Sequence, residues 1–280
     1  MEENVITSVQ NVRVKHVVAL QQKSSLRREE GLFVVEGQRE IEHCIACGYE
    51  VTELFLCRDI RPRMSEFIQG SGHTRAYVPT EISPVVYEKM AYRGSTEGLI
   101  AVVKAKDHNL SLITHHLSLR KNPLIVVLES VEKPGNLGAV LRTAEAAHVD
   151  AVIVCDPLTD FYNPNVIRAS IGGVFNVPTA ASSTKECIAF LKQQGIRILT
   201  AQLQDSHDYY DYDMAHATAI VMGTESTGLT DAWREAADAH IRIPMLGRLD
   251  SLNVSVSAAI LMYEAVRQRN KIYQGIEPKM

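Results

Sequence analysis

The chain has 280 residues, of which 46% are hydrophobic and 22% charged, a composition typical of folded globular domains and long enough for two of them. No apolar run approaches the roughly 18 residues that a membrane helix needs, and the acidic start Met1–Asn4 does not resemble a secretory signal. The five cysteines are odd in number and scattered. A disulfide framework is therefore not expected, and a reducing cytoplasm fits better.

The first hundred residues alternate helical and extended patterns. Apolar spacing predicts helices over 9–22, 38–46 and 83–90, and a proline-containing helix that begins at Pro62. Short apolar runs predict strands over 31–36, 51–57, 98–103 and near 75–78. Residues 1–106 are therefore predicted to form a small α/β domain. A polar linker over 107–122, with room for one short helix, follows it.

A second α/β series begins at Pro123 and is predicted to form a domain over 123–280. Its predicted strands cover 124–128, 151–155, 175–177, 196–200, 219–223 and 240–243. Its predicted helices cover 137–147, 165–171, 184–194, 231–237 and 253–270. Continuous apolar strands separated by helices predict a mostly parallel sheet that is covered on both faces.

Basic side chains without intervening acids gather in the first predicted helix and just after it: Arg13, Lys15, Lys23, Arg27 and Arg28. Such a patch could neutralise RNA backbone phosphates, although an ordinary solvated helix face has the same pattern. Arg168 follows a strand end in the second half and is a further candidate for RNA contact. Asn163 in the same segment could instead only cap a helix.

In an open parallel sheet, ligands bind beyond the C-terminal ends of the strands. Three such junctions are rich in glycine, proline and polar residues, at 128–138, 222–229 and 243–255. Each could by itself be an ordinary turn or helix cap, with Asn136 or Asn253 as the cap. The first junction lacks the G-x-G-x-x-G spacing, which argues against an ordinary dinucleotide fold.

Taken together and in order, the three junctions resemble the signature motifs of the SpoU/TrmH family, RNA methyltransferases of the SPOUT superfamily. The matching segments are Pro134-Gly-Asn-Leu-Gly-Ala-Val-Leu-Arg-Thr-Ala144, Gly223-Thr-Glu-Ser-Thr-Gly-Leu229, Ile243-Pro-Met245 and Ser251-Leu-Asn-Val-Ser-Val-Ser-Ala-Ala259. Residues 1–106 also resemble the family's N-terminal substrate-binding domain, chiefly through Phe33-Val-Val-Glu-Gly-Gln-Arg39. Two residues depart from the usual motifs: Thr224 stands where asparagine is common, and Lys133 stands where an acid is common.

The resemblance implies an RNA ribose 2′-O-methyltransferase that uses S-adenosylmethionine and has a C-terminal trefoil knot. It also implies a homodimer with active sites at the subunit interface, although burial within one subunit would equally explain the apolar final helix. The cofactor-binding residues that it implies are Met222, Gly223, Thr224, Gly228, Ile243, Pro244, Met245, Leu252 and Asn253. The catalytic residues that it implies are Asn136, Arg142, Glu225, Ser251 and Asn253.

The family assigns activation of the ribose hydroxyl to the arginine that matches Arg142. Because a guanidinium stays protonated in proteins, we expect Arg142 to clamp a phosphate and to stabilise the forming alkoxide electrostatically. Members with an added N-terminal domain commonly act on large-subunit ribosomal RNA, which is therefore the expected substrate, with transfer RNA as the alternative. A non-catalytic RNA-binding protein of ribosome assembly and an enzyme acting on a small molecule are rival hypotheses.

The sequence does not predict a metal site. Cys44 and Cys47 have C-x-x-C spacing, but no second pair follows them, so core thiols are the expectation. The histidines at 115, 116 and 207 lack a third ligand at a familiar spacing.

Overall fold

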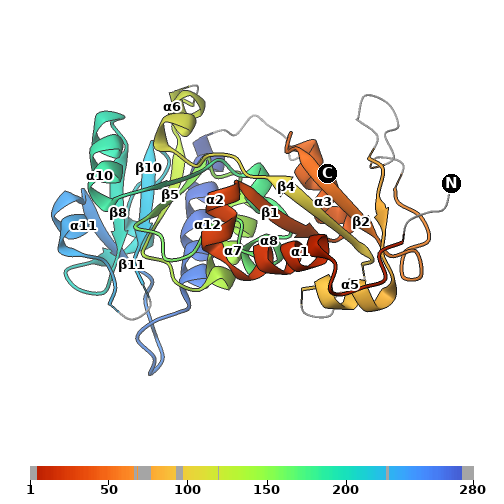
Figure 1. Ribbon diagram of the computed structural model, residues 1–280. Coiled ribbons are helices and arrows are strands. Elements are labelled where there is room, and N and C mark those ends of the chain that lie inside the picture. The colour runs from red at the N-terminus through yellow and green to blue at the C-terminus, as the bar shows by residue number, and fades with distance from the viewer. Residues whose placement is uncertain are drawn as a thin grey trace. The chain divides into compact units, whose positions relative to one another are not determined.

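The computed structural model describes residues 5–65, 68, 77–92, 97–118, 120–224 and 227–272 (Figure 1). The chain forms two compact units, which we call the N-terminal unit (1–107 with 160–176) and the C-terminal unit (108–159 with 177–280). The segment 160–176, which the sequence analysis placed in the second domain, thus has its main contacts with the N-terminal unit. Among the described residues, no helix is long and apolar enough to cross a membrane.

The N-terminal unit contains a mixed four-stranded sheet in the order β1-β4-β2-β3, in which β4 is antiparallel to β1 and β2, and β3 is parallel to β2. Its strands are β1 (Leu32–Glu36), β2 (Val51–Leu56), β3 (Thr80–Glu81) and β4 (Leu99–Lys104). Its helices are α1 (Val12–Gln22), α2 (Ser24–Glu30), α3 (Gln38–Ala46), α5 (Pro84–Met90), α8 (Pro164–Ser170) and α9 (Gly173–Asn176). Helices α1 and α5 cover one face, where Leu20, Phe55 and Met90 belong to the same buried core.

The segment 160–176 is held in the N-terminal unit by aromatic stacking and an ion pair. Tyr162 stacks on Phe33 with ring centroids 4.1 Å apart, and Phe175 meets Tyr49 edge to face at 5.2 Å. The Asp160 carboxylate accepts two hydrogen bonds from Arg27, at 3.1 and 2.6 Å. Since aromatic contacts and a buried ion pair are costly to break, this segment is an integral part of the N-terminal unit.

The C-terminal unit contains a seven-stranded sheet in the order β7-β6-β5-β10-β8-β11-β9, in which every neighbouring pair is parallel. Its strands are β5 (Leu124–Glu129), β6 (Ala151–Cys155), β7 (Thr179–Ser182), β8 (Arg197–Ala201), β9 (His207–Asp208), β10 (Thr218–Met222) and β11 (Ala239–Arg242). Its helices are α6 (Leu110–Ser118), α7 (Pro134–Ala146), α10 (Thr184–Gln193), α11 (Asp231–Ala236), α12 (Val254–Ile272) and the 3₁₀ turn η1 (Tyr209–Asp211).

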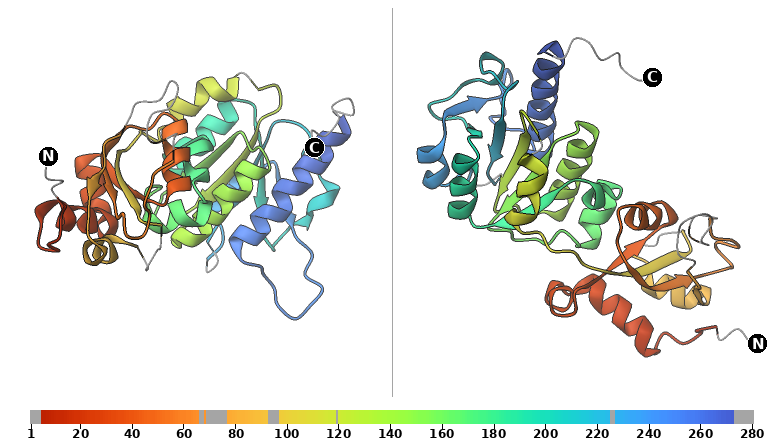
Figure 2. Two further views of the ribbon diagram at one scale, coloured as in Figure 1. Left: turned by 90° about the vertical axis from the view of Figure 1, so that its right-hand side faces the viewer. Right: turned by 90° about the horizontal axis from the view of Figure 1, so that it is seen from above.

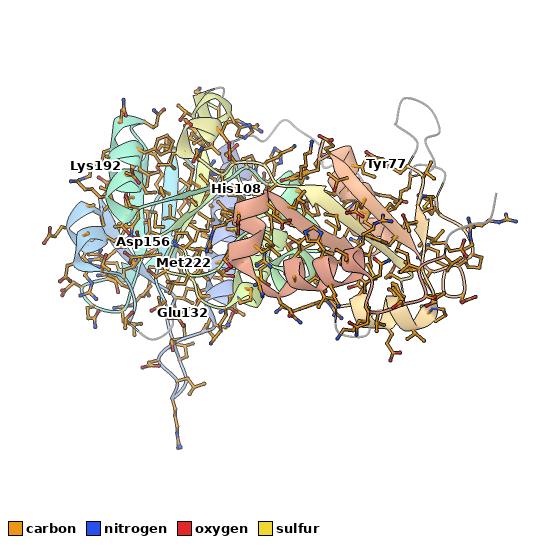
Figure 3. The ribbon with its side chains drawn as sticks, viewed as in Figure 1. Tyr77, His108, Glu132, Asp156, Lys192 and Met222 are labelled. Carbon is orange, nitrogen blue, oxygen red and sulfur yellow. The ribbon has the colours of Figure 1, made fainter. Side chains whose placement is uncertain are left out.

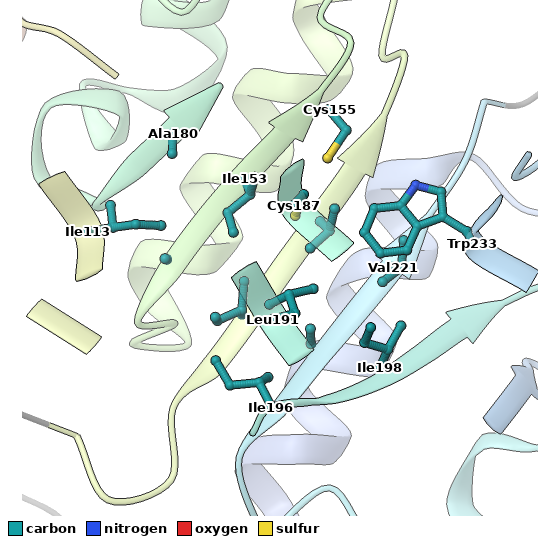
Figure 4. Packing of buried hydrophobic residues seen from close by; sticks show 14 of the residues in the cluster. Ile113, Ile153, Cys155, Ala180, Cys187, Leu191, Ile196, Ile198, Val221 and Trp233 are labelled. Atoms are coloured by element: carbon teal, nitrogen blue, oxygen red, sulfur yellow. The ribbon is translucent and has the colours of Figure 1, made fainter. Parts of the chain in front are cut away.

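Both faces of this sheet are covered, as the continuous apolar strands predicted. Helices α7 and α12 lie side by side on one face, which Figure 2 shows. Helices α6, α10 and α11 pack on the other, where Trp233, Leu191 and Ile113 close a core over β5, β6, β8 and β10 (Figure 4). The predicted α/β fold with a parallel sheet is confirmed.

Several predicted elements differ from the structure. The strand predicted over 175–177 was wrong: α9 ends at Asn176 and the strand β7 begins at Thr179, because Phe175 turns into the aromatic cluster instead of extending. The helix α2 was not predicted. Residues 62–65 are not helical and 77–78 are not a strand, whereas the remainder of both predicted elements lies largely outside the described residues.

Candidate functional site

The site lies where the strand order of the parallel sheet reverses. The chain runs outward from β5 through β6 to β7 and returns to the other side of β5, where β10 is its neighbour. Loops that leave such neighbouring strands in opposite directions open a crevice, the usual ligand position in this class of sheet. Met222 ends β10 and Glu132 lies in the loop after β5, and both are labelled in Figure 3.

Two cavities adjoin at this point. The larger, about 610 Å³ in volume, we call the cofactor cleft; it lies beyond β8, β10 and β11. The smaller, about 210 Å³, lies beyond β5 at the start of α7. Gly223, Thr224 and Val254 line both of them.

The second motif folds into a tight loop that no side chain at Gly223 would allow. A Cβ atom there would lie 2.2 Å from the carbonyl carbon and oxygen of Gly228. Thr224 and Gly228 pair through two backbone hydrogen bonds of 3.3 and 3.2 Å, and Gly228 has the positive φ of +68° that favours glycine. The loop therefore brings bare backbone to the cleft wall. Glu225 lies outside the described residues.

The third motif, the last of the three along the chain, is held in the site by the side chain of Asn253. Asn253 caps α12, since its side-chain oxygen accepts hydrogen bonds from the Ser255 amide at 3.0 Å and hydroxyl at 2.6 Å. Its side-chain amide donates to the Asn136 side-chain oxygen at 3.1 Å. This bond joins the first and third motifs across 117 residues of sequence.

Most of the predicted cofactor-binding residues line the same cleft: Met222, Gly223, Thr224, Gly228, Ile243, Met245, Leu252 and Asn253. Ser251 lines it as well, and Asn136 lines the smaller cavity. Pro244 and Arg142 line neither of the two. Arg142 is exposed on α7, six positions after Asn136. At about 100° per residue, the two side chains leave the helix roughly 120° apart.

A buried carboxylate fixes the loops around the site. Glu129, which ends β5, is only 3% exposed. It accepts hydrogen bonds from the Thr184 hydroxyl at 3.0 Å and from the Thr230 hydroxyl and amide at 2.7 and 2.9 Å. Thr184 begins α10 and Thr230 follows the second motif. Because a buried charge is tolerated only when it is hydrogen-bonded, these three elements must keep their positions together.

The cleft also contains residues that the motifs did not reveal. Gln202 follows β8, and Arg234 lies on α11. The Arg242 guanidinium beside them is committed to Asp208 at 2.9 Å; the hydrogen bond from the Tyr210 hydroxyl and then that from Arg242 hold the pKa of Asp208 below its usual range. No sequence signal marked Gln202 or Arg234, because they come from a strand end and a helix outside the three motifs.

The lining suits S-adenosylmethionine. The volume of the cleft lies within the range of small-molecule sites. Its walls combine apolar side chains, such as Leu229 and Ile241, with the glycine backbone of the second motif, which lets a flat purine approach closely. The volume of the cleft, its apolar side chains and its glycine backbone therefore fit a nucleoside cofactor.

The predicted RNA-contacting residues differ in their exposure to solvent and in whether an acidic side chain already pairs with them. Lys15, Lys23 and Arg28 are exposed. Arg13 pairs with Glu53 at 2.7 Å. Arg27 is only 4% exposed, since its guanidinium also donates to main-chain oxygens of α1. It stabilises the N-terminal unit and is not accessible to RNA.

Arg168 is exposed on α8, so it is accessible to RNA.

The first cysteine of the C-x-x-C pair, Cys44, is buried within α3, where burial raises the pKa of its thiol and makes the nucleophilic thiolate scarce.

Comparison with known proteins identifies the family to which the chain belongs. Residues 123–263 match the family model described as the SpoU rRNA Methylase family, and residues 11–101 match the MRM3-like substrate binding domain. The chain is 26% identical over 261 residues to the 23S rRNA (guanosine(2553)-2′-O)-methyltransferase RlmP of Bacillus subtilis. The aligned segment covers 92% of this chain and 97% of that relative.

Two solved structures are similar over nearly the whole chain. One is an RNA 2′-O ribose methyltransferase with 36% identity and a TM-score of 0.79, covering 95% of this chain and 99% of that one. The other is the SpoU methyltransferase AviRb of Streptomyces viridochromogenes in complex with AdoMet, with 27% identity and a TM-score of 0.81, covering 93% and 100%. The resemblance seen in the three motifs is confirmed, and the chain belongs to the SpoU rRNA methylase family.

Proposed function

We propose that this chain transfers a methyl group from S-adenosylmethionine to a ribose 2′-hydroxyl of large-subunit ribosomal RNA. The enzyme class and the cofactor follow from its family. The choice of ribosomal RNA is supported by the similarity to RlmP, a 23S rRNA 2′-O-methyltransferase. The observation that carries the proposal is the pair of adjoining cavities at the switch point, where the Asn253–Asn136 hydrogen bond joins the first and third motifs beside the second.

The cofactor cleft would hold S-adenosylmethionine, which supplies an electrophilic methyl group when it is bound. Gly223 and Gly228 would present backbone to the adenosine, and Met245 would add a soft apolar contact. Asn136 and Asn253 are close enough to orient the ribose that approaches from the smaller cavity.

Arg142 would act on the RNA and not on the cofactor. Its guanidinium would clamp the phosphate next to the target ribose and stabilise the negative charge that develops on the 2′-oxygen. A phosphate oxygen or a water molecule would accept the hydroxyl proton, because a guanidinium is a poor base at neutral pH. Such stabilisation typically contributes about 10²- to 10³-fold in rate.

The proposal includes a homodimer and a trefoil knot. Helix α12 exposes 47% of Val256 and 50% of Tyr263 beside α7, the helix that carries Arg142. An apolar face on this helix pair suits a second copy of the chain, which would bring its Arg142 to the cleft. A knot would result from threading the segment after β11 past the loop after β10, and both of these segments line the cleft.

The N-terminal unit would bind the RNA through lysines that lack an acidic partner. Lys15, Lys23 and Lys89 line a groove on α1 and α5, and in the described part of the chain none of the three is paired. Arg28 and Arg168 would add further phosphate contacts. Because ribosomes work in the cytoplasm, we propose that location for this protein.

The experiment that tests the proposal measures transfer of labelled methyl groups to undermethylated ribosomal and transfer RNA, with Arg142→Ala beside the wild type. We expect label in one ribose of ribosomal RNA and a loss of about 10²-fold or more in the variant. Label in transfer RNA alone would mean that transfer RNA, and not ribosomal RNA, is the substrate. A protein that neither transfers methyl groups nor binds the cofactor would be a non-catalytic RNA-binding protein.

A further inference from the structure

The groove between α1 and α5 in the N-terminal unit, which we call the α1–α5 groove, is about 170 Å³ in volume and has both basic and apolar walls. Its three lysines are exposed, and every other described residue that lines it is uncharged. The apolar residues in this lining are Val9, Val14, Val18 and Ala19. Contact with RNA phosphates would explain the lysines, but it would not explain the apolar lining between them.

Helices α1 and α5 lie side by side and run in the same direction. Just before the two helices, the Ile6 amide donates to the Glu81 main-chain oxygen at 2.9 Å. Near their ends, Gln21 Nε2 donates to the Met90 main-chain oxygen at 2.8 Å. The first turns of both helices therefore lie at one end of the groove and their last turns at the other.

The apolar surface continues onto the first turn of each helix. Val12 is 80% exposed one turn before Lys15, and Val85 is 64% exposed one turn before Lys89. A single exposed valine needs no explanation on a protein surface. These two, however, each lie beside a lysine of the groove on the same helix face, so apolar and cationic side chains alternate along the pair of helices.

We propose that the α1–α5 groove binds unpaired nucleotides of the RNA, with bases against the valines and phosphates on the lysines. The inference rests on the RNA substrate proposed above, and it specifies a single-stranded segment for the N-terminal unit. An unpaired nucleotide carries an apolar base face next to an anionic phosphate, which matches this pairing of side chains. Gln22, which also lines the groove, has an amide that can donate to a base edge and accept from it.

A duplex fits the groove less well. Its base faces are hidden in the stack, and its outer surface consists of hydrated phosphates and sugars. Phosphates placed against Val12 and Val85 would lose part of their hydration without gaining an apolar contact. Phosphate contacts alone would instead favour the duplex, because its charge density is higher than that of a single strand.

The test measures binding of two RNAs to the full chain by fluorescence anisotropy at several salt concentrations. One RNA is a short strand without self-complementarity, and the other is the same strand annealed to its complement. Val12→Ser combined with Val85→Ser removes apolar surface without changing the charge, and serine is well tolerated in the first turn of a helix. Val78→Ser is the control, since Val78 is 91% exposed in the same unit but lies outside both helices.

We expect the wild type to bind the single strand more tightly than the duplex. The double variant should bind the single strand about 3- to 10-fold more weakly, because two valine side chains lose the base that covered them. The factor should be the same at every salt concentration, since no phosphate contact is lost. Duplex binding and the melting temperature of the double variant should match the wild type, as should all properties of Val78→Ser.

Tighter binding of the duplex by the wild type would overturn the inference, and so would a double variant with wild-type affinity for the single strand. Equal weakening of both RNAs, or a lower melting temperature together with weaker binding, would also overturn it, because the valines would then support the fold and not the base contact. In all these cases methyl transfer to RNA would still uphold the proposed function. Failure of the wild type to bind either RNA would contradict the proposed function itself, and the inference with it.

Discussion

At the scale of single residues, the site depends on backbone that side chains would block. Gly223 lies where a Cβ atom would meet the Gly228 carbonyl group at 2.2 Å, and neither partner is a flexible side-chain end that could move aside. The requirement for glycine is therefore steric, and it belongs to the loop and not to the strand that precedes it.

We predict that Gly223→Ala will open this loop and abolish measurable cofactor binding, with a loss of about 1–3 kcal/mol in the free energy of unfolding, as in other overpacked sites. Calorimetric titration with S-adenosylhomocysteine and denaturant unfolding measure the two effects. Gly135→Ala is the control, because nothing lies within 4 Å of its added Cβ atom. If Gly223→Ala bound the ligand normally, the loop would not be part of the cofactor site.

At the scale of secondary-structure elements, Asn253 has two separable tasks. Its oxygen caps α12 through Ser255, and its amide nitrogen reaches Asn136 on α7. Helix α12 packs on α7 and on the strands below, so the cap fixes where the third motif enters the site.

Aspartate at position 253 would retain the cap and lose the donor. We predict that Asn253→Asp will fold as stably as the wild type but methylate RNA far more slowly, because two oxygens would then face each other. Asn253→Ala should lose activity and also about 1 kcal/mol of stability, the usual value of an N-cap. Thermal unfolding and single-turnover methyl transfer test this pair. Equal destabilisation by both substitutions would contradict the separation of tasks.

The α1–α5 groove supports a second prediction at this scale. Replacing Lys15, Lys23 and Lys89 together by glutamine should weaken RNA binding, and the slope of log affinity against log salt should fall by about one for each lost phosphate contact. Fluorescence titrations at several salt concentrations measure the slope. Lys104→Gln is the control, since Lys104 pairs with Glu50 at 2.9 Å. An unchanged slope would place the RNA elsewhere.

At the scale of the whole molecule, the Arg142 side chain and the cofactor cleft of one chain need not belong to the same active site. Arg142 lines neither cavity of its own chain, and it leaves α7 on a different side from Asn136. A homodimer would reconcile this geometry with catalysis if each subunit supplied Arg142 to the other.

Mixed dimers test this arrangement. Arg142→Ala and Gly223→Ala should each be inactive alone, and co-expression of the two should restore activity, because one cleft of the mixed dimer would be intact and would receive an intact arginine from its partner. Purification through two different tags isolates the mixed species. If the arginine acted within its own chain, every mixed dimer would stay inactive, since neither subunit would carry both parts.

The local pattern of the sequence predicted much of the fold. The periodicity of apolar residues located β6 and α3 at their observed bounds, and it placed most other elements within a few residues. It succeeded because strands buried on both faces and helices buried on one have periods that neighbouring residues alone create. The order of the three motifs predicted the family for the same reason, since each motif is a continuous segment.

Tertiary structure decided what depends on contacts between distant segments. Arg27 belongs to a basic run by sequence, yet Asp160, 133 positions later, buries it in an ion pair. Phe175 belongs to an apolar run that predicted a strand, yet it lies in the short helix α9, from which its ring contacts Phe33 and Tyr49. Gln202 enters the cleft because β8 lies between β10 and β11. Pairing across the sheet fixes such neighbours, and no local pattern encodes it.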